Sequence, residues 1–278
     1  MINPDQKHFY DQNGYLLLKH LFGLDEVENY TNHYMRLRLQ GSYPGDTSGV
    51  DIGGNDPLKK FPRMIHMHRW DQISLDWMID HRIATALTTL MDREPFAVQT
   101  MLYFKPPKAR GQALHQDQFY LRAQPGTCIA AWMALDSCDE ENGCLQVVPG
   151  SHDWPLLCTI KADTNQSFSP VSVPIPDGTP ILSLVMEPGD VLFFNGQVVH
   201  GSLPNRTEDR FRRALIGHYI GGEAEMVSKF YHPILRMNGT EVKLAESQRG
   251  GECGVWTDEK GTQKIEVVSI EGLADRTE

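Results

Sequence analysis

The segment "ALHQDQFY" contains the only H-x-D motif in the chain, formed by His115 and Asp117. Residues i and i+2 of a β-strand point to the same face, so this imidazole and this carboxylate could reach one ion. That donor pair suits a borderline metal such as Fe(II) better than the all-oxygen sites of Mg²⁺ or Ca²⁺. An H-x-D motif is a weak signal by itself, and a metal site needs a third ligand.

His200 is the candidate third ligand, because it ends the apolar segment "DVLFFNGQVVH". Two histidines and one carboxylate leave three adjacent metal positions open, which is typical of non-haem Fe(II) oxygenases. A 2-oxo acid takes two of these positions, and dioxygen takes the third. We therefore interpret His115, Asp117 and His200 as a metal site and catalytic centre. The competing histidines are His66, His68, His81, His152 and His218, of which His152 is expected in a structural turn and His218 on a strand that could face inward.

A bound 2-oxo diacid also needs a cation at its far carboxylate. Arginine is the preferred group, because its planar fork makes two parallel hydrogen bonds to a carboxylate and stays charged when buried. The segment "NRTEDRFRRALIGHY" offers Arg206, Arg210, Arg212 and Arg213. Arg212 and Arg213 are adjacent at the start of a predicted strand and point to opposite faces, so only one of them can face the interior.

Substrate contacts are expected directly after the H-x-D motif and in the long segment 41–70. Residues 41–62 are rich in Gly, Pro and Asp and are predicted to form a binding loop or lid. The alternative for these side chains is packing of a helical region against the barrel. The candidates are Gln118, Phe119 and Tyr120 after the motif, and Arg63, His66, Arg69 and Trp70 in the loop.

The remaining pattern predicts a mainly β protein with a helical N-terminal third. Residues 1–40 and 70–92 show helical periodicity, interrupted by a predicted strand at Tyr15 to Leu18. From about residue 96, short β-rich segments alternate with Gly, Pro, Asn and Asp, which predicts an antiparallel barrel or jelly roll. We expect one domain over residues 1–278. Its parts are a helical packing region at about 1–95, a jelly-roll core at about 96–220 and a C-terminal extension at about 221–278.

Composition narrows the partners. The formal net charge is -10, which argues against a nucleic-acid or anionic-membrane partner and leaves a small-molecule substrate. The five cysteines are odd in number and form no C-x-x-C pair, so we expect reduced thiols. No signal-peptide pattern opens the chain and no apolar run is long enough to span a membrane, which predicts a cytoplasmic protein. Nothing in the sequence indicates an oligomeric state.

The motifs "LHQDQFY", "AAWMALDSCDEENGCLQVVPGSH", "PGDVLFFNGQVVHGS" and "NRTEDRFRRA" resemble the phytanoyl-CoA dioxygenase family in order and spacing over roughly residues 96–220. The resemblance implies a double-stranded β-helix (a cupin-like jelly roll), Fe(II), and 2-oxoglutarate and O₂ as co-substrates that yield succinate and CO₂. It makes His115, Asp117 and His200 the iron ligands and Arg212 the carboxylate anchor. Arg213 remains a rival, because the turn after Asn205 is one residue longer than in some relatives.

The resemblance also places Lys105 and Trp132 in the co-substrate pocket. Gln99 and Tyr103 lie at even offsets from Lys105 and are expected to share its face. Asn142-Gly143 is predicted to be a hairpin turn rather than a binding element. Asp117 favours hydroxylation over halogenation, since related halogenases carry a small residue there.

The predicted function is therefore a dioxygenase that hydroxylates an unactivated C–H of a small metabolite or natural-product intermediate. One alternative is a cupin-like metalloenzyme that does not use 2-oxoglutarate. The other is a binding module without catalysis, which would predict a damaged triad.

Overall fold

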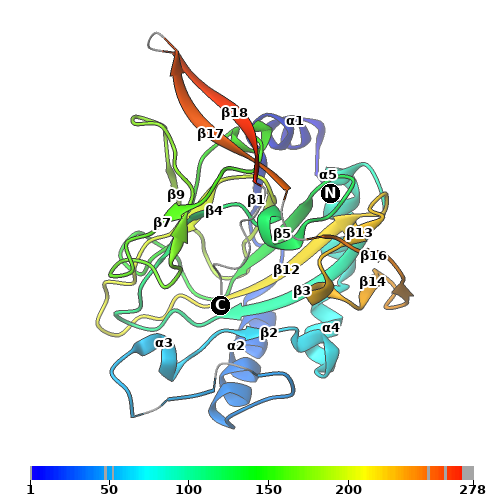
Figure 1. Ribbon diagram of the computed structural model, residues 1–278. Helices are drawn as coiled ribbons and strands as arrows, with labels where there is room; N and C mark the ends of the chain where they lie inside the picture. Colours follow the sequence, from blue (N-terminus) through cyan, green and yellow to red (C-terminus); the bar gives the residue numbers. More distant parts are fainter. Residues whose placement is uncertain (1, 47–48, 52, 249–250, 260–261, 271–278) are drawn as a thin grey trace.

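Helices form most of the first part of the chain in the computed structural model, which describes residues 2–46, 49–51, 53–248, 251–259 and 262–270 (Figure 1). Asn3 caps the first helix by accepting a hydrogen bond from the backbone of Gln6, and Gly14 ends it with a left-handed φ of 76°. Asp80 caps another by accepting from the backbone N–H of Arg82. The helices are α1 (Pro4–Asn13), α2 (Leu24–Leu39), α3 (Pro57–Lys60), α4 (Gln72–Met78), α5 (His81–Met91) and, further on, α6 (Gln118–Leu121).

Two antiparallel sheets follow. Among the described residues, the larger sheet has the order β1 (Tyr15–Leu18), β10 (Val191–Asn195), β5 (Cys128–Ala134), β12 (Ala214–Gly221), β3 (Pro95–Tyr103), β14 (Ile234–Arg236) and β15 (Glu241–Val242), with β2 (Met64–Ile65) also paired to β3. The smaller sheet has the order β4 (Gln112–His115), β11 (His200–Ser202), β6 (Leu145–Val147) and β9 (Leu182–Leu184). Three two-stranded sheets are also described: β7 (Ile160–Lys161) with β8 (Val171–Ser172), β13 (Met226–Val227) with β16 (Ala245–Glu246), and the longer hairpin of β17 (Gly251–Glu259) with β18 (Thr262–Ile270).

Strand alternation divides the core into two faces of the larger sheet. On β5, Met133 packs in one cluster with Trp77 and Leu87 of the helices. Its neighbour Trp132 packs instead with Leu145 of the smaller sheet. Since successive side chains of a strand point to opposite faces, the helices cover the outer face and the smaller sheet faces the inner one. Side chains that perform chemistry between the sheets must therefore lie on the inner face.

The prediction of a mainly β fold is confirmed, and that of a helical N-terminal third is confirmed in part. Strands β1 and β2 of the first 95 residues pair with β10 and β3 of the larger sheet. The predicted loop 41–62 contains the short helix α3. Strands β14 and β15 of the C-terminal extension also join the larger sheet, so the sheet crosses the region boundaries expected at residues 95 and 220.

The prediction that all five cysteines are reduced is wrong for two of them. Cys158 and Cys253 form a disulfide with a Cα–Cα distance of 4.9 Å. They meet because β17 runs beside residues 156–158, where Gly254 donates to the Leu156 carbonyl. That contact joins segments far apart in sequence, which cysteine counting cannot detect. Cys128, Cys138 and Cys144 are buried free thiols. Within the described ranges, no helix is both long and apolar enough to cross a membrane.

Candidate active site

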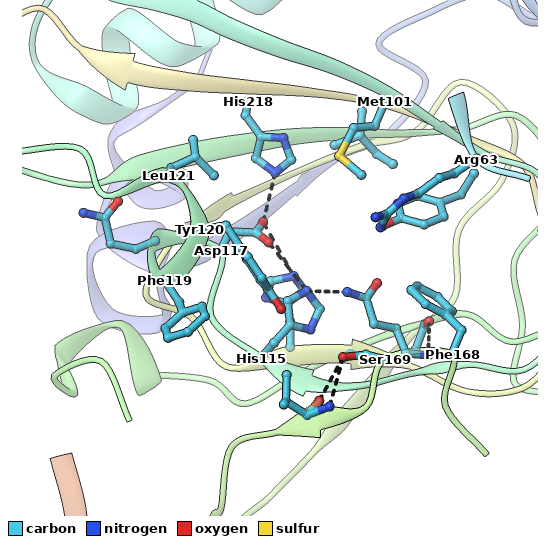
Figure 2. Close-up of a pocket in the computed structure, with 18 of the residues that line it drawn as sticks. Arg63, Met101, His115, Asp117, Phe119, Tyr120, Leu121, Phe168, Ser169 and His218 are labelled. Carbon is cyan, nitrogen blue, oxygen red and sulfur yellow. Dashed lines mark hydrogen bonds and ion pairs between the residues drawn. The ribbon is translucent and has the colours of Figure 1, made fainter. Parts of the chain in front are cut away.

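A cavity of about 1630 Å³ lies along the inner face of the larger sheet. Both sheets line it, as do residues 56–65, residues 156–161 and the start of β17. It exceeds the roughly 300–1000 Å³ of a typical small-molecule pocket, so it can hold a co-substrate and a second molecule together. His115, Asp117 and His200 lie in its wall (Figure 2).

Strand pairing brings the two histidines together. His115 ends β4 and His200 begins β11, and the two residues are direct partners across the antiparallel pair. Asp117 lies beyond the end of β4 with helical φ and ψ of -64° and -32°, so the prediction that one strand carries the whole H-x-D motif is wrong. The turn into α6 nevertheless directs the carboxylate back to the histidines. One ligand atom from each of the three residues lies within 4.8 Å of the others.

Backbone carbonyls orient both imidazoles. Nδ1 of His115 lies 2.9 Å from the Ala113 carbonyl, and Nδ1 of His200 lies 3.0 Å from the Val198 carbonyl. A carbonyl only accepts, so each Nδ1 carries the proton and each Nε2 keeps a free lone pair. The Nε2 atoms lie 3.5 and 3.6 Å from the Asp117 carboxylate oxygens. Both lone pairs can therefore be directed at one ion. The Gln112 amide nitrogen lies 3.0 Å from Nε2 of His115 and would have to move away before a metal binds there.

A further histidine holds the carboxylate. Nε2 of His218, on β12, lies 3.0 Å from Oδ2 of Asp117. Burial by itself would raise the pKa of Asp117, but His200 and His218 hold it well below its usual value. Burial, together with the neighbouring His115, lowers the pKa of His200 to about 4. At neutral pH the site therefore presents an ionised carboxylate and a neutral imidazole, the forms that bind a metal.

The other competing histidines lie outside this cluster of described residues. His68 contacts the Thr100 hydroxyl at 2.9 Å, and His66 packs against Phe230. Burial lowers the pKa of both imidazoles to about 3. His81 is exposed at the start of α5, and Nε2 of His152 donates to the Asp11 carbonyl in a structural contact.

Arg212 and Arg213 point in opposite directions. Arg212 is 4 % exposed, lines the cavity and places its guanidinium 5.2 Å from the centre of the Trp132 ring. Its Nε donates to the Gly143 carbonyl, while its buried Nη1 has no partner. Arg213 instead donates from its backbone and its guanidinium to the Asp136 carboxylate. Of these two arginines, it is therefore Arg212 that lies on the cavity wall with an N–H group lacking a protein partner.

Lys105 lies beside Arg212 but is already fully engaged. Its Nζ donates to the Gly143 carbonyl at 3.0 Å, to the Ser202 hydroxyl at 2.9 Å and to the Leu203 carbonyl. Burial, followed by repulsion from Arg212, lowers its pKa well below the usual value. With three acceptors in place, Lys105 fixes the surrounding chain rather than presenting a donor to the cavity.

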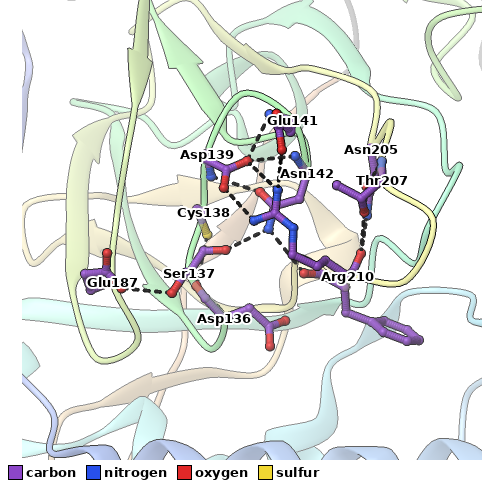
Figure 3. Close-up of polar contacts among 11 residues, drawn as sticks. Asp136, Ser137, Cys138, Asp139, Glu141, Asn142, Glu187, Asn205, Thr207 and Arg210 are labelled. Atoms are coloured by element: carbon purple, nitrogen blue, oxygen red, sulfur yellow. Dashed lines mark hydrogen bonds and ion pairs between the residues drawn. The ribbon is translucent and has the colours of Figure 1, made fainter.

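The prediction of a hairpin at Asn142-Gly143 is wrong, because this turn lies between β5 of the larger sheet and β6 of the smaller sheet, which do not pair. Its contribution to the site was not predicted. Asn142 donates to the carbonyl groups of Ser137 and Phe211, and Arg210 pairs with Asp139 (Figure 3). These contacts hold a turn in which Gly143 has a left-handed φ of 84°. The Gly143 carbonyl then accepts hydrogen bonds from Lys105 and Arg212. The Asn-Gly pair is the one sequence feature that indicates a turn here, and it does not predict these contacts.

Some of the residues expected to contact the co-substrate or the substrate line the cavity, and others do not. Gln99, Tyr103, Gln118, Phe119 and Tyr120 line it. Gln118 is buried, and its amide donates to the Ala123 carbonyl, so it shapes the loop. His66 and Trp70 are not among the lining residues, because His66 packs on Phe230 and Trp70 stacks on Tyr43. Their positions do not support the expected substrate contact.

Comparisons with known proteins identify the family. A sequence model described as Phytanoyl-CoA dioxygenase (PhyH) matches residues 10–214. The chain is 29% identical over 242 residues to the peroxisomal phytanoyl-CoA dioxygenase of Rattus norvegicus, covering 82% of this chain and 71% of the relative. It is 25% identical over 238 residues to phytanoyl-CoA dioxygenase of Arabidopsis thaliana, covering 73% and 84%.

Solved structures share the fold at lower identity. The epimerase SnoN in complex with Fe³⁺, α-ketoglutarate and nogalamycin RO is 22% identical with a TM-score of 0.63, covering 80% of this chain and 84% of that one. EctD from S. alaskensis with bound Fe is 21% identical with a TM-score of 0.64, covering 79% and 77%. EvdO2 from Micromonospora carbonacea var. aurantiaca complexed with 2-oxoglutarate is 23% identical with a TM-score of 0.62, covering 80% and 92%.

Proposed function

The chain belongs to the phytanoyl-CoA dioxygenase family and is a 2-oxoglutarate-dependent non-haem iron dioxygenase, and from this premise we propose that it hydroxylates an unactivated C–H of a small-molecule metabolite or natural-product intermediate. We assign Fe(II) to His115, Asp117 and His200. One observation carries this proposal: the triad and Arg212 line the same cavity, and the buried Nη1 of Arg212 has no protein partner. The family assignment disfavours the alternative of a cupin-like enzyme that does not use 2-oxoglutarate.

The donor set fits Fe(II). Two imidazole Nε2 atoms and one ionised carboxylate match the facial arrangement of such enzymes, and three protein ligands leave open positions for small molecules. When bound, iron with 2-oxoglutarate and O₂ supplies the oxidation of a C–H bond, with release of succinate and CO₂. The chain orients the groups and excludes competing reactions. The Ala113 and Val198 carbonyls fix the imidazole tautomers, and His218 fixes the carboxylate.

We assign the far carboxylate of 2-oxoglutarate to Arg212. Its guanidinium is held by Trp132 and by the Gly143 carbonyl, so little side-chain freedom is lost when a carboxylate binds. Lys105 is assigned a positioning role, because it donates to the neighbouring carbonyl groups of Gly143 and Leu203 and so holds these two chain segments together beside the site. Gln99 and Tyr103 are proposed to line the co-substrate space from β3, and Phe119 and Tyr120 to line the substrate space, with Gln118 supporting that loop.

We treat residues 1–278 as one domain with a double-stranded β-helix core built from the two antiparallel sheets. A cytoplasmic location remains part of the proposal, supported by the free thiols of Cys128, Cys138 and Cys144. The Cys158–Cys253 disulfide and the peroxisomal rat relative point to other compartments. Cell fractionation with a peroxisomal and an extracellular marker distinguishes these locations.

Removing the support behind Asp117 should weaken metal binding. We expect His218→Ala to lower Fe(II) affinity about 10- to 100-fold, because the carboxylate loses the group that orients it. Anaerobic calorimetric titration with Fe(II) measures this affinity. His218→Gln, which keeps a donor, should restore part of the affinity. Exposed His81→Ala is the matched control. Equal Fe(II) affinity in His218→Ala and wild type would contradict the positioning role.

Succinate release tests the function. The protein is incubated in air with Fe(II), ascorbate and a panel of small metabolites, with 2-oxoglutarate present or omitted. We expect slow succinate formation with 2-oxoglutarate alone, acceleration by a substrate, and no product without 2-oxoglutarate. Product formed without 2-oxoglutarate would instead support the cupin-like alternative.

A further inference from the structure

The cavity carries a local positive charge inside an acidic protein. Among the described residues, its wall contains seven lysines and arginines but only three carboxylates. Asp117 is committed to the metal site, Asp56 is paired with Arg110 at 3.0 Å, and Glu252 is exposed. This excess of basic side chains favours anionic ligands in the cavity.

Most of these basic side chains are already assigned to the co-substrate or engaged in other contacts. Arg212 and Lys105 form the proposed co-substrate end, where 2-oxoglutarate has a single far carboxylate to offer. Arg110 has its Asp56 partner. Lys59 and Lys161 are exposed lysines, and an ammonium lacks the planar fork that binds a carboxylate through two parallel hydrogen bonds. Arg122, which directly follows α6, donates to the Phe119 and Gln248 carbonyls.

Arg63 is the remaining arginine: it is exposed on the cavity wall, and no carboxylate pairs with it in the described structure. Its Nη1 donates to the Tyr103 hydroxyl at 3.2 Å, and its guanidinium lies 6.0 Å from the centre of that ring. This single contact fixes the direction of the guanidinium but leaves most of its five N–H donors unused. Figure 2 shows Arg63 directed into the space where Asp117 and His115 also lie.

Aromatic rings line the cavity both near Arg63 and near the candidate metal ligands. Tyr103 lies 6.1 Å from Phe168, and Phe119 lies 5.2 Å from Tyr120, measured between ring centres. The Tyr120 ring in turn lies 6.3 Å from the ring of His115. Such walls accept an apolar or aromatic body, while one planar cation accepts one carboxylate. A phosphate dianion would need a second unpaired cation beside Arg63.

Resting on the proposed function, we infer that the substrate is a small apolar or aromatic monocarboxylic acid, whose free carboxylate binds Arg63 while its body lies among these rings beside the metal. Arg63 is thus a specificity-determining residue. A thioester or amide of the same acid has no anionic carboxylate to pair with Arg63 and binds more weakly.

Calorimetry on the anaerobic enzyme, loaded with Fe(II) and 2-oxoglutarate, tests this. The probes are octanoate and hydrocinnamate, with octanamide, hydrocinnamamide and hydrocinnamoyl-CoA as comparisons. Wild type is expected to prefer at least one acid over its amide by about 10- to 100-fold, the usual range for a hydrogen-bonded ion pair. Arg63→Gln should abolish that preference, and Arg63→Lys should restore part of it. Lys161→Gln, which removes the charge of an exposed lysine, should keep it.

Three outcomes overturn the inference. The first is a wild type that binds no acid more tightly than its amide. The second is tighter binding of the CoA thioester than of the free acid. The third is an Arg63→Gln effect confined to the KM for 2-oxoglutarate, which would place Arg63 at the co-substrate. Succinate formation by wild type without added substrate is measured separately, so failure of the proposed function is distinguishable from failure of the carboxylate assignment.

Discussion

Replacing Asp117 with Ala is expected to abolish substrate-dependent succinate formation, a loss of at least about a thousandfold, equivalent to about 4 kcal/mol of transition-state stabilisation. Asp117 is the only carboxylate in the triad, and it offers its two oxygens at 3.5 and 3.6 Å from the two Nε2 atoms. Without it, two imidazoles remain, and they hold Fe(II) weakly. The measurements are succinate release under saturating 2-oxoglutarate and anaerobic Fe(II) titration.

Two controls separate ligand loss from general damage. Asp177→Ala removes an exposed carboxylate far from the triad in sequence and should behave as wild type. Circular dichroism and thermal unfolding of Asp117→Ala should show that the fold persists. The ligand assignment fails if Asp117→Ala keeps substrate-dependent turnover or binds Fe(II) with wild-type affinity.

Replacing Arg212 with Gln should raise the KM for 2-oxoglutarate about 30- to 150-fold, which corresponds to about 2–3 kcal/mol for a hydrogen-bonded ion pair. The reason is that its buried Nη1 has no partner until a carboxylate arrives. Glutamine keeps a polar group there but loses the charge and the fork. Initial rates of succinate formation at varied 2-oxoglutarate measure the KM. Thermal unfolding with the inert analogue N-oxalylglycine should show reduced stabilisation of the variant.

Arg213→Gln is the matched control for Arg212→Gln, because it removes the same charge from the neighbouring residue. It breaks the ion pair with Asp136, whose oxygen lies 2.6 Å from Nη2 of Arg213. We expect a lower melting temperature with an unchanged KM for 2-oxoglutarate. The reverse pattern, a raised KM in Arg213→Gln and a normal one in Arg212→Gln, would exchange the two assignments.

The sequence by itself determined the chemistry of the chain and the class of its fold. Donor types are read directly from residues, so His115, Asp117 and His200 were identified as candidates without coordinates. Short apolar segments between turn residues predicted the mainly β architecture, because strand periodicity is a local property. Motif order and spacing indicated the family.

Only the tertiary structure decided which side chains meet. Arg212 and Arg213 are equivalent candidates in the sequence, and the pairing of Arg213 with Asp136 separates them. The Cys158–Cys253 disulfide depends on β17 lying beside a distant segment. In the sequence, Arg63 is one of several loop candidates. The structure places it on the cavity wall, with no carboxylate paired to it among the described residues. Each of these features depends on which distant segments of the chain lie side by side, and the packing and burial of the whole chain decide that. Sequence patterns report only on residues that are neighbours along the chain.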